Sequence, residues 1–306
     1  MRLSRKGEGF TLTAWHRPLT LSRQNAGCAV VRSSPLPPGE GSVTDILIDG
    51  LAPIEADLHY LALVNYGAYT SFRVEDGGVR GLALHLARLE ASSVELFGAA
   101  VGQGRLRDLL RTALGDRREA WVRISLFSPD IWPRMPSETG APKVMTSVSP
   151  PPPPLADSLR LQVQTYGREE PHIKHTASMG LIRARRSART DGFDDALFAD
   201  PDGVISEGSS WNIGFVTGDT VVWPQAPMLA GVAQALIAQG LSGVGLDQRA
   251  APVPVAELSA FDAAFICNSA TPACPVTAIA EAAFYPRPDL IARIRAAWAV
   301  NTVEPI

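Results

Sequence analysis

Residues 159–217 read LRLQVQTYGREEPHIKHTASMGLIRARRSARTDGFDDALFADPDGVISEGSSWNIGFVT. The stretch opens with apolar and polar residues in alternation at 159–164, which predicts a strand. A helix is expected over 179–188. The turn at 200–203 then joins 196–199 to 204–206 in a hairpin, and a second hairpin begins at 211–217. This mixture of helices and hairpins indicates an α+β protein rather than regular βαβ winding.

Further elements are expected on both sides of this stretch. Apolar residues recur at helical spacing over 82–97, and Gly98 is a typical helix end. We also expect helices at 106–114, 232–239 and 290–300, and strands at 46–48, 69–74, 120–127, 220–223 and 263–267. Residues 60–64 form another apolar run, which the pattern leaves unassigned.

The composition is that of a globular protein, and its length of 306 residues favours two domains. A net charge of −3 argues against nucleic-acid binding. The sequence contains no run of about 18 apolar residues, so we expect no membrane span. Three cysteines without metal-ligand spacing predict no metal site and favour a reducing, cytoplasmic location.

The five prolines at 150–154 favour an extended connection between domains. We therefore expect a small α/β domain at 43–149 and a larger domain at 155–306. Residues 1–42 are rich in Arg, Gly, Ser and Pro. They are interpreted as a leader, which is a targeting segment, a disordered extension or the product of a misassigned start.

Lysine is rare in this chain and occurs only at positions 6, 143 and 174, although Lys and Arg together number 28. Arginine replaces lysine easily on a surface, but not where an amine must lose its proton and attack a carbonyl. Lys6 lies in the leader and Lys143 beside the proline-rich connection. Lys174, between a strand and a helix, is therefore the candidate reactive amine.

A second set of candidates has the chemistry to bind a phosphorylated pyridine. Glu207, in the segment Ser206-Glu207-Gly208-Ser209-Ser210-Trp211-Asn212, is a carboxylate that can hold the proton of a pyridine nitrogen. Arg88 can bind phosphate with two N–H groups. Val232 and Ala233 follow Gly231 at an expected helix start, which is an anion site. Ser269 follows the strand at 263–267 and adds further donors.

The order of these segments resembles that of the class IV aminotransferases. That order is His-Leu-x-Arg-Leu at 85–89, Ile-Lys-His at 173–175, Ser-Glu-Gly-Ser-Ser-x-Asn at 206–212, Leu-x-Gly at 229–231, and Ser-Ala at 269–270 with Pro-Val at 275–276 downstream. The family includes branched-chain and D-amino-acid aminotransferases and aminodeoxychorismate lyase. The resemblance spans residues 64–279.

The resemblance implies a two-domain fold of the D-amino-acid-aminotransferase type, pyridoxal 5′-phosphate (PLP) as cofactor, and a homodimer acting on small amino and keto acids. Lys174 would form the Schiff base and shuttle the proton, and Glu207 would pair with the pyridinium. Arg88, the backbone of Val232 and Ala233, and Ser269 would hold the phosphate. Ser269 and Ala270 would also bind the substrate carboxylate.

Three functions remain open at this point. The first is transamination between an amino acid or amine and a 2-keto acid. The second is a lyase that releases pyruvate from aminodeoxychorismate on the same scaffold. The third is a binding protein that has lost catalysis, which is suggested by Ala233 because the family commonly has threonine in this loop.

Overall fold

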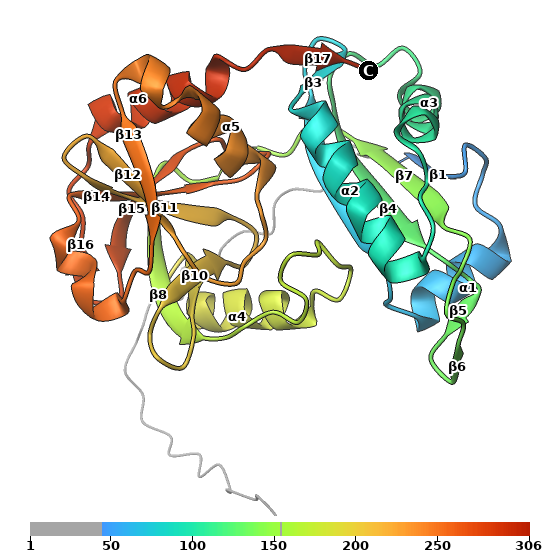
Figure 1. Cartoon of the computed structure of the whole chain (residues 1–306), viewed down its shortest axis with the longest axis horizontal. Coiled ribbons are helices and arrows are strands. Elements are labelled where there is room, and N and C mark those ends of the chain that lie inside the picture. Colours follow the sequence, from blue (N-terminus) through green and yellow to red (C-terminus); the bar gives the residue numbers. More distant parts are fainter. Residues whose placement is uncertain (1–44, 154) are drawn as a thin grey trace, which may run out of the picture. The chain divides into compact units, whose positions relative to one another are not determined.

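The computed structural model describes residues 45–153 and 155–306 (Figure 1). The predicted leader at 1–42 and Pro154 of the predicted linker lie outside these ranges. None of the described helices is long and apolar enough to cross a membrane.

The first half of the described chain forms a four-stranded antiparallel sheet. Its strand order is β1 (Asp45–Ile48), β7 (Lys143–Ser149), β4 (Ala120–Phe127) and β2 (Ala68–Val74). Alternation along β4 buries Val122, Ile124 and Leu126 completely. These side chains join a core with α2 (Leu82–Phe97) and α3 (Gln103–Leu114), so both helices cover one face of the sheet (Figure 1).

Helix α2 has the bounds that the sequence predicts. Leu82, Leu86 and Leu89 are fully buried on one side of it, and Gly98 ends it with φ of 67°. That left-handed conformation is costly for residues with a Cβ, which explains why glycine stands there. At the other end, Glu304 Oε2 accepts the backbone N–H of Ala83 at 3.0 Å and satisfies one of the free donors of the first turn.

The second half forms a nine-stranded mixed sheet. Eight strands follow the order β10-β9-β8-β15-β14-β11-β12-β13, and β16 pairs with β15. Their bounds are β8 Leu159–Thr165, β9 Asp195–Ala199, β10 Ile205–Gly208, β11 Asn212–Thr217, β12 Thr220–Pro224, β13 Asp247–Ala251, β14 Ala263–Cys267, β15 Cys274–Ile279 and β16 Ala282–Ala283.

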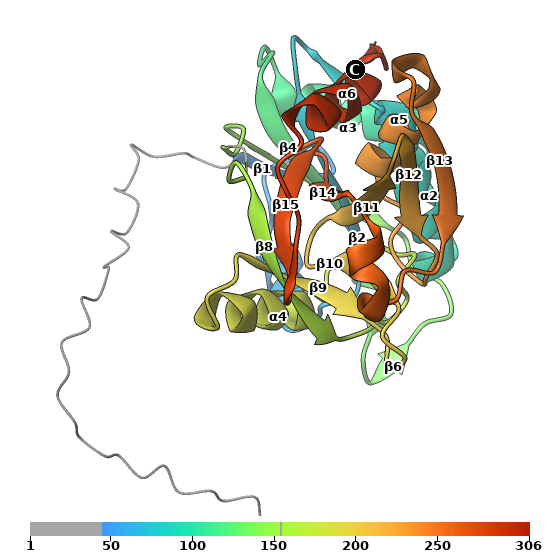
Figure 2. The ribbon, with the colours of Figure 1, turned by 90° about the vertical axis from the view of Figure 1, so that its left-hand side faces the viewer.

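Three helices accompany this sheet. Helices α5 (Val232–Gly240) and α6 (Pro288–Ala299) lie side by side, and both contribute to a core with β11, β12 and β14 (Figure 2). Helix α4 (Met179–Thr190) packs on β9 through Ala184 and Ala188. The remaining elements are α1 (Glu55–Leu63), β3 (Gly78–Arg80), β5 (Ile131–Trp132), β6 (Met135–Pro136), η1 (Ser242–Val244), η2 (Val255–Ala260) and β17 (Val303–Pro305).

Most of the predicted elements are confirmed with bounds that differ by at most three residues, and the α+β class is confirmed. The apolar run at 60–64 lies almost entirely in α1. Strands β7 and β15 were not predicted. Lys143 is therefore not part of a loose connection. It opens β7, and its Nζ lies 2.6 and 2.7 Å from the two carboxylate oxygens of buried Asp57.

Candidate active site

One cavity of about 240 Å³ brings together residues from both sheets. It is lined by every site residue that the sequence predicts: Arg88, Lys174, Glu207, Val232, Ala233, Ser269 and Ala270. These residues come from α2, the β8–α4 connection, β10, the start of α5 and the segment after β14. The proposed roles differ, but the structure places all seven around the same space.

Lys174 is held at the cavity wall by backbone pairing with β2. The Tyr69 N–H donates to the Lys174 carbonyl at 2.8 Å, and the Thr176 N–H donates to Gly67 at 2.8 Å. The β8–α4 connection thus runs along the start of β2 and is fixed at two points. The Lys174 Nζ atom lies 4.9 Å from the centre of the Tyr69 ring.

The surroundings of Lys174 favour its neutral amine. Desolvation lowers the pKa of Lys174 to about 7, with further lowering by the charges of Arg88 and Arg168, while Glu207 opposes the shift. Only a neutral amine can attack a carbonyl. A substantial fraction of Lys174 is therefore reactive at neutral pH, in contrast to an ordinary lysine.

Glu207 faces Lys174 and pairs with a buried arginine. Arg168 Nη1 lies 3.3 Å from Glu207 Oε1, and the Leu229 N–H donates to Glu207 Oε2 at 3.3 Å. Burial raises the pKa of Glu207, but Arg168 and the Leu229 N–H oppose that rise. Arg168 also donates to the Ile173 carbonyl at 2.7 Å, which ties it to the lysine segment.

Arg88 and the start of α5 form a site suited to an anion. Arg88 donates to the Ala230 carbonyl at 3.0 Å and to Thr70 Oγ1 at 3.2 Å, while its buried Nε has no partner among the described residues. The first backbone N–H groups of α5, at Val232 and Ala233, point out of the helix and attract negative charge. A Cβ on Gly231 would lie 1.9 Å from Asn212 Oδ1, so this close approach requires glycine.

The segments that contain Ser209 and Ser269 have different roles. Ser209 donates to the buried carboxylate of Asp195 at 2.7 Å, and Trp211 donates to the same group at 3.0 Å, so Ser209 fixes the loop that carries Glu207. The Ala270 N–H donates to Asn268 Oδ1 at 3.0 Å. Ser269 Oγ has a hydrogen-bonding contact with His85 Nε2 at 3.5 Å and faces the cavity.

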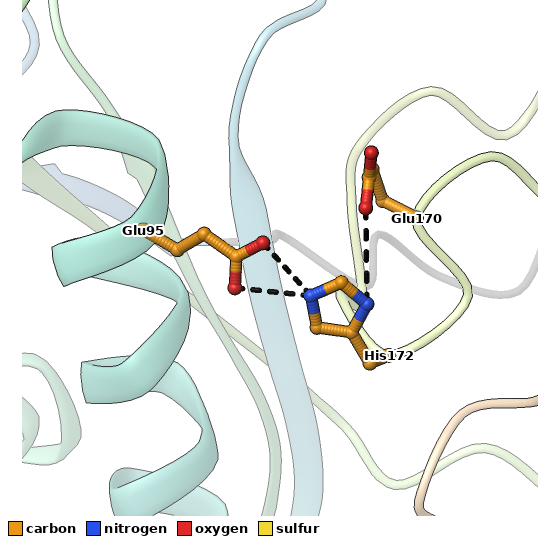
Figure 3. A group of neighbouring side chains, drawn as sticks. All are labelled: Glu95, Glu170 and His172. Atoms are coloured by element: carbon orange, nitrogen blue, oxygen red, sulfur yellow. Dashed lines mark hydrogen bonds and ion pairs between the residues drawn. The ribbon is translucent and has the colours of Figure 1, made fainter.

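His172, two residues before Lys174, links the lysine segment to α2 (Figure 3). Its Nε2 atom lies 2.8 Å from Glu95 Oε1, and its Nδ1 atom lies 3.8 Å from Glu170. The three residues are exposed and offer metal-type ligands. The two carboxylates approach opposite nitrogens of the ring, so His172 bridges Glu95 of α2 and Glu170 of the lysine segment.

Sequence reasoning missed three polar residues near the lysine. Arg168 lies in the stretch 159–217 and His85 in the motif at 85–89, but the spacing of neither residue indicates that it lies near Lys174. Arg123 follows the alternation of β4, and its guanidinium stacks on the Tyr69 ring at 3.7 Å. Arg123 could have been found from its position, because it places a long cationic side chain on the polar side of the strand predicted at 120–127.

Comparison with known proteins gives a consistent result. No curated protein sequence matches the chain, but its structure matches solved transaminases. A fold IV transaminase from Curtobacterium pusillum is 23% identical with a TM-score of 0.65, over 77% of this chain and 85% of its own. The branched-chain amino acid aminotransferase from Escherichia coli is 18% identical with a TM-score of 0.72, over 84% of this chain and 94% of its own.

A hypothetical aminotransferase from Mycobacterium tuberculosis, solved in a PLP-bound form, is 20% identical with a TM-score of 0.67. The match covers 79% of this chain and 92% of the Mycobacterium tuberculosis protein. At these identities the structural matches establish the fold, which is fold type IV. The family model for class IV aminotransferases matches residues 67–279, which is more than half of the sequence. The chain therefore belongs to the class IV aminotransferase family of enzymes.

Proposed function

We propose that this enzyme is a PLP-dependent aminotransferase that moves an amino group between an amino acid or amine and a 2-keto acid through Lys174. The observation that carries the proposal is the cavity of about 240 Å³ in which Lys174, Glu207 and Arg88 meet the start of α5. Several of the similar solved structures contain PLP or its aminated form. The family and the cavity support the same assignment.

The donor set of the cavity fits PLP. Arg88 has a buried, unpartnered Nε among the described residues and adjoins the free N–H groups of Val232 and Ala233, which together suit a phosphate. Glu207 is a buried carboxylate suited to a pyridinium nitrogen. Lys174 supplies an amine with a pKa of about 7 for covalent attachment.

Each of these side chains has a definable task in amino-group transfer. When bound, PLP supplies an electron sink for the substrate carbon. The Lys174 amine, with a pKa near neutrality, can accept a proton at Nζ and return it, which is the requirement for a general base and acid at neutral pH. The Arg168 guanidinium favours the ionised form of Glu207, and that form is needed to hold a pyridinium proton.

Substrate contacts and assembly complete the proposal. Ser269 and Ala270 line the cavity beside the phosphate donors, and they would contact the substrate carboxylate. We also propose a homodimer, as the family resemblance implies, and a cytoplasmic location, which the scattered cysteines favour. Light scattering coupled to size-exclusion chromatography of the holoenzyme tests the assembly, and a monomeric mass under all loading concentrations would contradict it.

The decisive experiment is the visible absorption spectrum of the purified protein with PLP, for wild type, Lys174→Ala and Lys143→Arg. Wild type and Lys143→Arg should form the covalent lysine–PLP adduct, and Lys174→Ala should not. Lys143→Arg is the matched control because arginine can keep the pairing with Asp57. Absence of the adduct from all three proteins at saturating PLP would refute the assignment and favour a binding protein.

A substrate screen then separates transamination from lysis. A transaminase loses the absorption of the adduct with an amino donor and recovers it only when a keto acid is added. A lyase releases pyruvate from aminodeoxychorismate without a second keto acid. Pyruvate release with no requirement for an acceptor would replace the transaminase assignment with the lyase.

A further inference from the structure

A chain of buried polar groups connects the predicted phosphate arginine to Ser269 through a histidine. His85 lies in the first turn of α2, one turn before Arg88, and is almost fully buried. Its Nδ1 atom lies 2.7 Å from Thr70 Oγ1, which also accepts an N–H from Arg88 at 3.2 Å. Its Nε2 atom lies 3.5 Å from Ser269 Oγ.

The hydrogen-bond capacity of Thr70 determines the direction of this chain. One lone pair of the Thr70 hydroxyl accepts from Arg88, and the hydroxyl proton needs an acceptor because Thr70 is fully buried. His85 Nδ1 is the acceptor that the described residues offer. The neutral ring then carries its proton on Nε2, which faces Ser269.

The ring is neutral in this position. Burial lowers the pKa of His85 well below its ordinary value, and the charges of Arg88 and Lys174 lower it further. His85 therefore does not act as a cation toward an anion in the cavity. It has one N–H to donate, and Ser269 Oγ is the group in reach of that N–H.

We propose that His85 is a positioning residue for the cofactor phosphate, because its Nε2–H donates to Ser269 Oγ and leaves the Ser269 hydroxyl proton free to donate to phosphate. The inference rests on the proposed function. His85 itself lines no part of the main cavity, so it acts through Ser269.

A second feature raises the importance of Ser269 in this arrangement. Ala233, at the start of α5, has no hydroxyl, whereas Ser269, which lines the same cavity, has one. A small cavity of about 20 Å³ is lined by His85, Ala233 and Ser269 together with neighbouring residues. The three residues therefore share one space behind the phosphate donors.

The test measures dissociation constants for PLP and for pyridoxal, which lacks the phosphate, in His85→Asn and His85→Gln. Asn places an acceptor near Thr70 but cannot reach Ser269, whereas Gln places an N–H donor near the position of Nε2. We expect His85→Asn to weaken PLP binding about 3- to 10-fold and to leave pyridoxal binding unchanged. His85→Gln should recover most of the loss.

Combining His85→Asn with Ser269→Ala in a double variant tests whether His85 affects PLP binding through Ser269. If His85 acts through the Ser269 hydroxyl, His85→Asn should add little further loss once Ser269→Ala is present. Equal weakening of PLP and pyridoxal, or full additivity with Ser269→Ala, would overturn the proposal. Wild-type protein that forms no covalent PLP adduct would instead refute the proposed function, so the two failures are distinguishable.

The histidine tautomer gives a measurement on the wild-type protein alone. Side-chain nitrogen NMR of the wild-type protein, with each histidine ring assigned through bonds to its own backbone, should show His85 neutral and protonated on Nε2. Protonation on Nδ1 would overturn the proposal even if every variant failed to fold.

Discussion

Lys143 and Lys174 lie in different surroundings in the same chain. Lys143 Nζ contacts both oxygens of the Asp57 carboxylate at 2.6 and 2.7 Å. Lys174 lies among arginines, and desolvation together with Arg88 and Arg168 lowers its pKa to about 7. Reactivity therefore depends on the neighbours of each lysine and not on exposure alone.

The first prediction concerns selective modification of the apoenzyme. Because its pKa is lowered to about 7, Lys174 is neutral at pH 7 far more often than a lysine with an ordinary pKa, which is less than about 0.1% neutral. A small amine-reactive reagent should therefore modify Lys174 before Lys143, and its rate should rise through pH 7 and then level off. Peptide mass spectrometry measures both sites. Equal rates at the two lysines would contradict the lowered pKa.

The same pKa predicts how Lys174 affects the stability of the apoenzyme. Between pH 7 and about 10.4, the unfolded state binds more protons at this site than the folded state, so the stability of the folded state rises with pH. Lys174→Met removes this penalty. Its melting temperature should exceed that of wild type by most at pH 6 and by less at pH 9. A difference that is constant or grows with pH would exclude the mechanism.

The sequence predicted the site residues that belong to recognisable motifs but not those that act across the fold. Lys174, Glu207 and Arg88 each stand in a segment with a chemical rationale of its own. Arg168 reaches Glu207 because of the path that the β8–α4 connection takes along β2. Local spacing in the sequence does not encode that path. His85 was quoted only as part of a motif, because its partners Thr70 and Ser269 are distant in sequence.

Among the elements, several with clear end signals were predicted, whereas two strands that contain or adjoin proline were not. Gly98 ends α2, and tight turns define the β9–β10 and β11–β12 hairpins. Strand β7 lies between Pro142 and Pro150, and β15 contains Pro275, although β15 pairs with β14 and β8. Proline indicates an interruption locally, and tertiary pairing overrides that signal here.

The crossing of α5 and α6 gives a prediction at this scale. A Cβ on Gly240 would lie 2.0 Å from the Ala297 carbonyl oxygen, which is backbone and cannot move aside. Gly240→Ala should therefore destabilise the protein by about 1–3 kcal/mol. Because α5 begins with Val232 and Ala233, movement of the helix should also weaken PLP binding.

Gly243→Ala is the matched control for Gly240→Ala. Among the described residues, no atom lies within 4 Å of a Cβ at Gly243, which stands three residues further along the chain. Its denaturation midpoint in urea should stay close to that of wild type. If both variants unfold at the same urea concentration, the tight crossing of the two helices is not what fixes α5.

For the whole molecule, the cavity depends on contacts between the two halves of the described chain. The Tyr69–Lys174 backbone bond, the Arg88 bond to Ala230 and the pairing of β17 with β3 all join segments more than 100 residues apart. Arg80 adds a stacking contact with Trp298 at 4.4 Å. The phosphate donors and the lysine therefore hold their separation only when both halves are folded.

This arrangement predicts that PLP stabilises the whole molecule, because it would bind groups of both halves in the folded state only. At a free concentration 100 times its dissociation constant, a ligand adds about 2.7 kcal/mol to the free energy of unfolding. For a chain of this size the melting temperature should rise by roughly 4–5 °C. Arg88→Gln weakens the phosphate site, so its shift at the same PLP concentration should be smaller. Calorimetry with one transition that moves as a unit would support joint stabilisation, whereas two transitions of which only one moves would show that PLP binds one half alone.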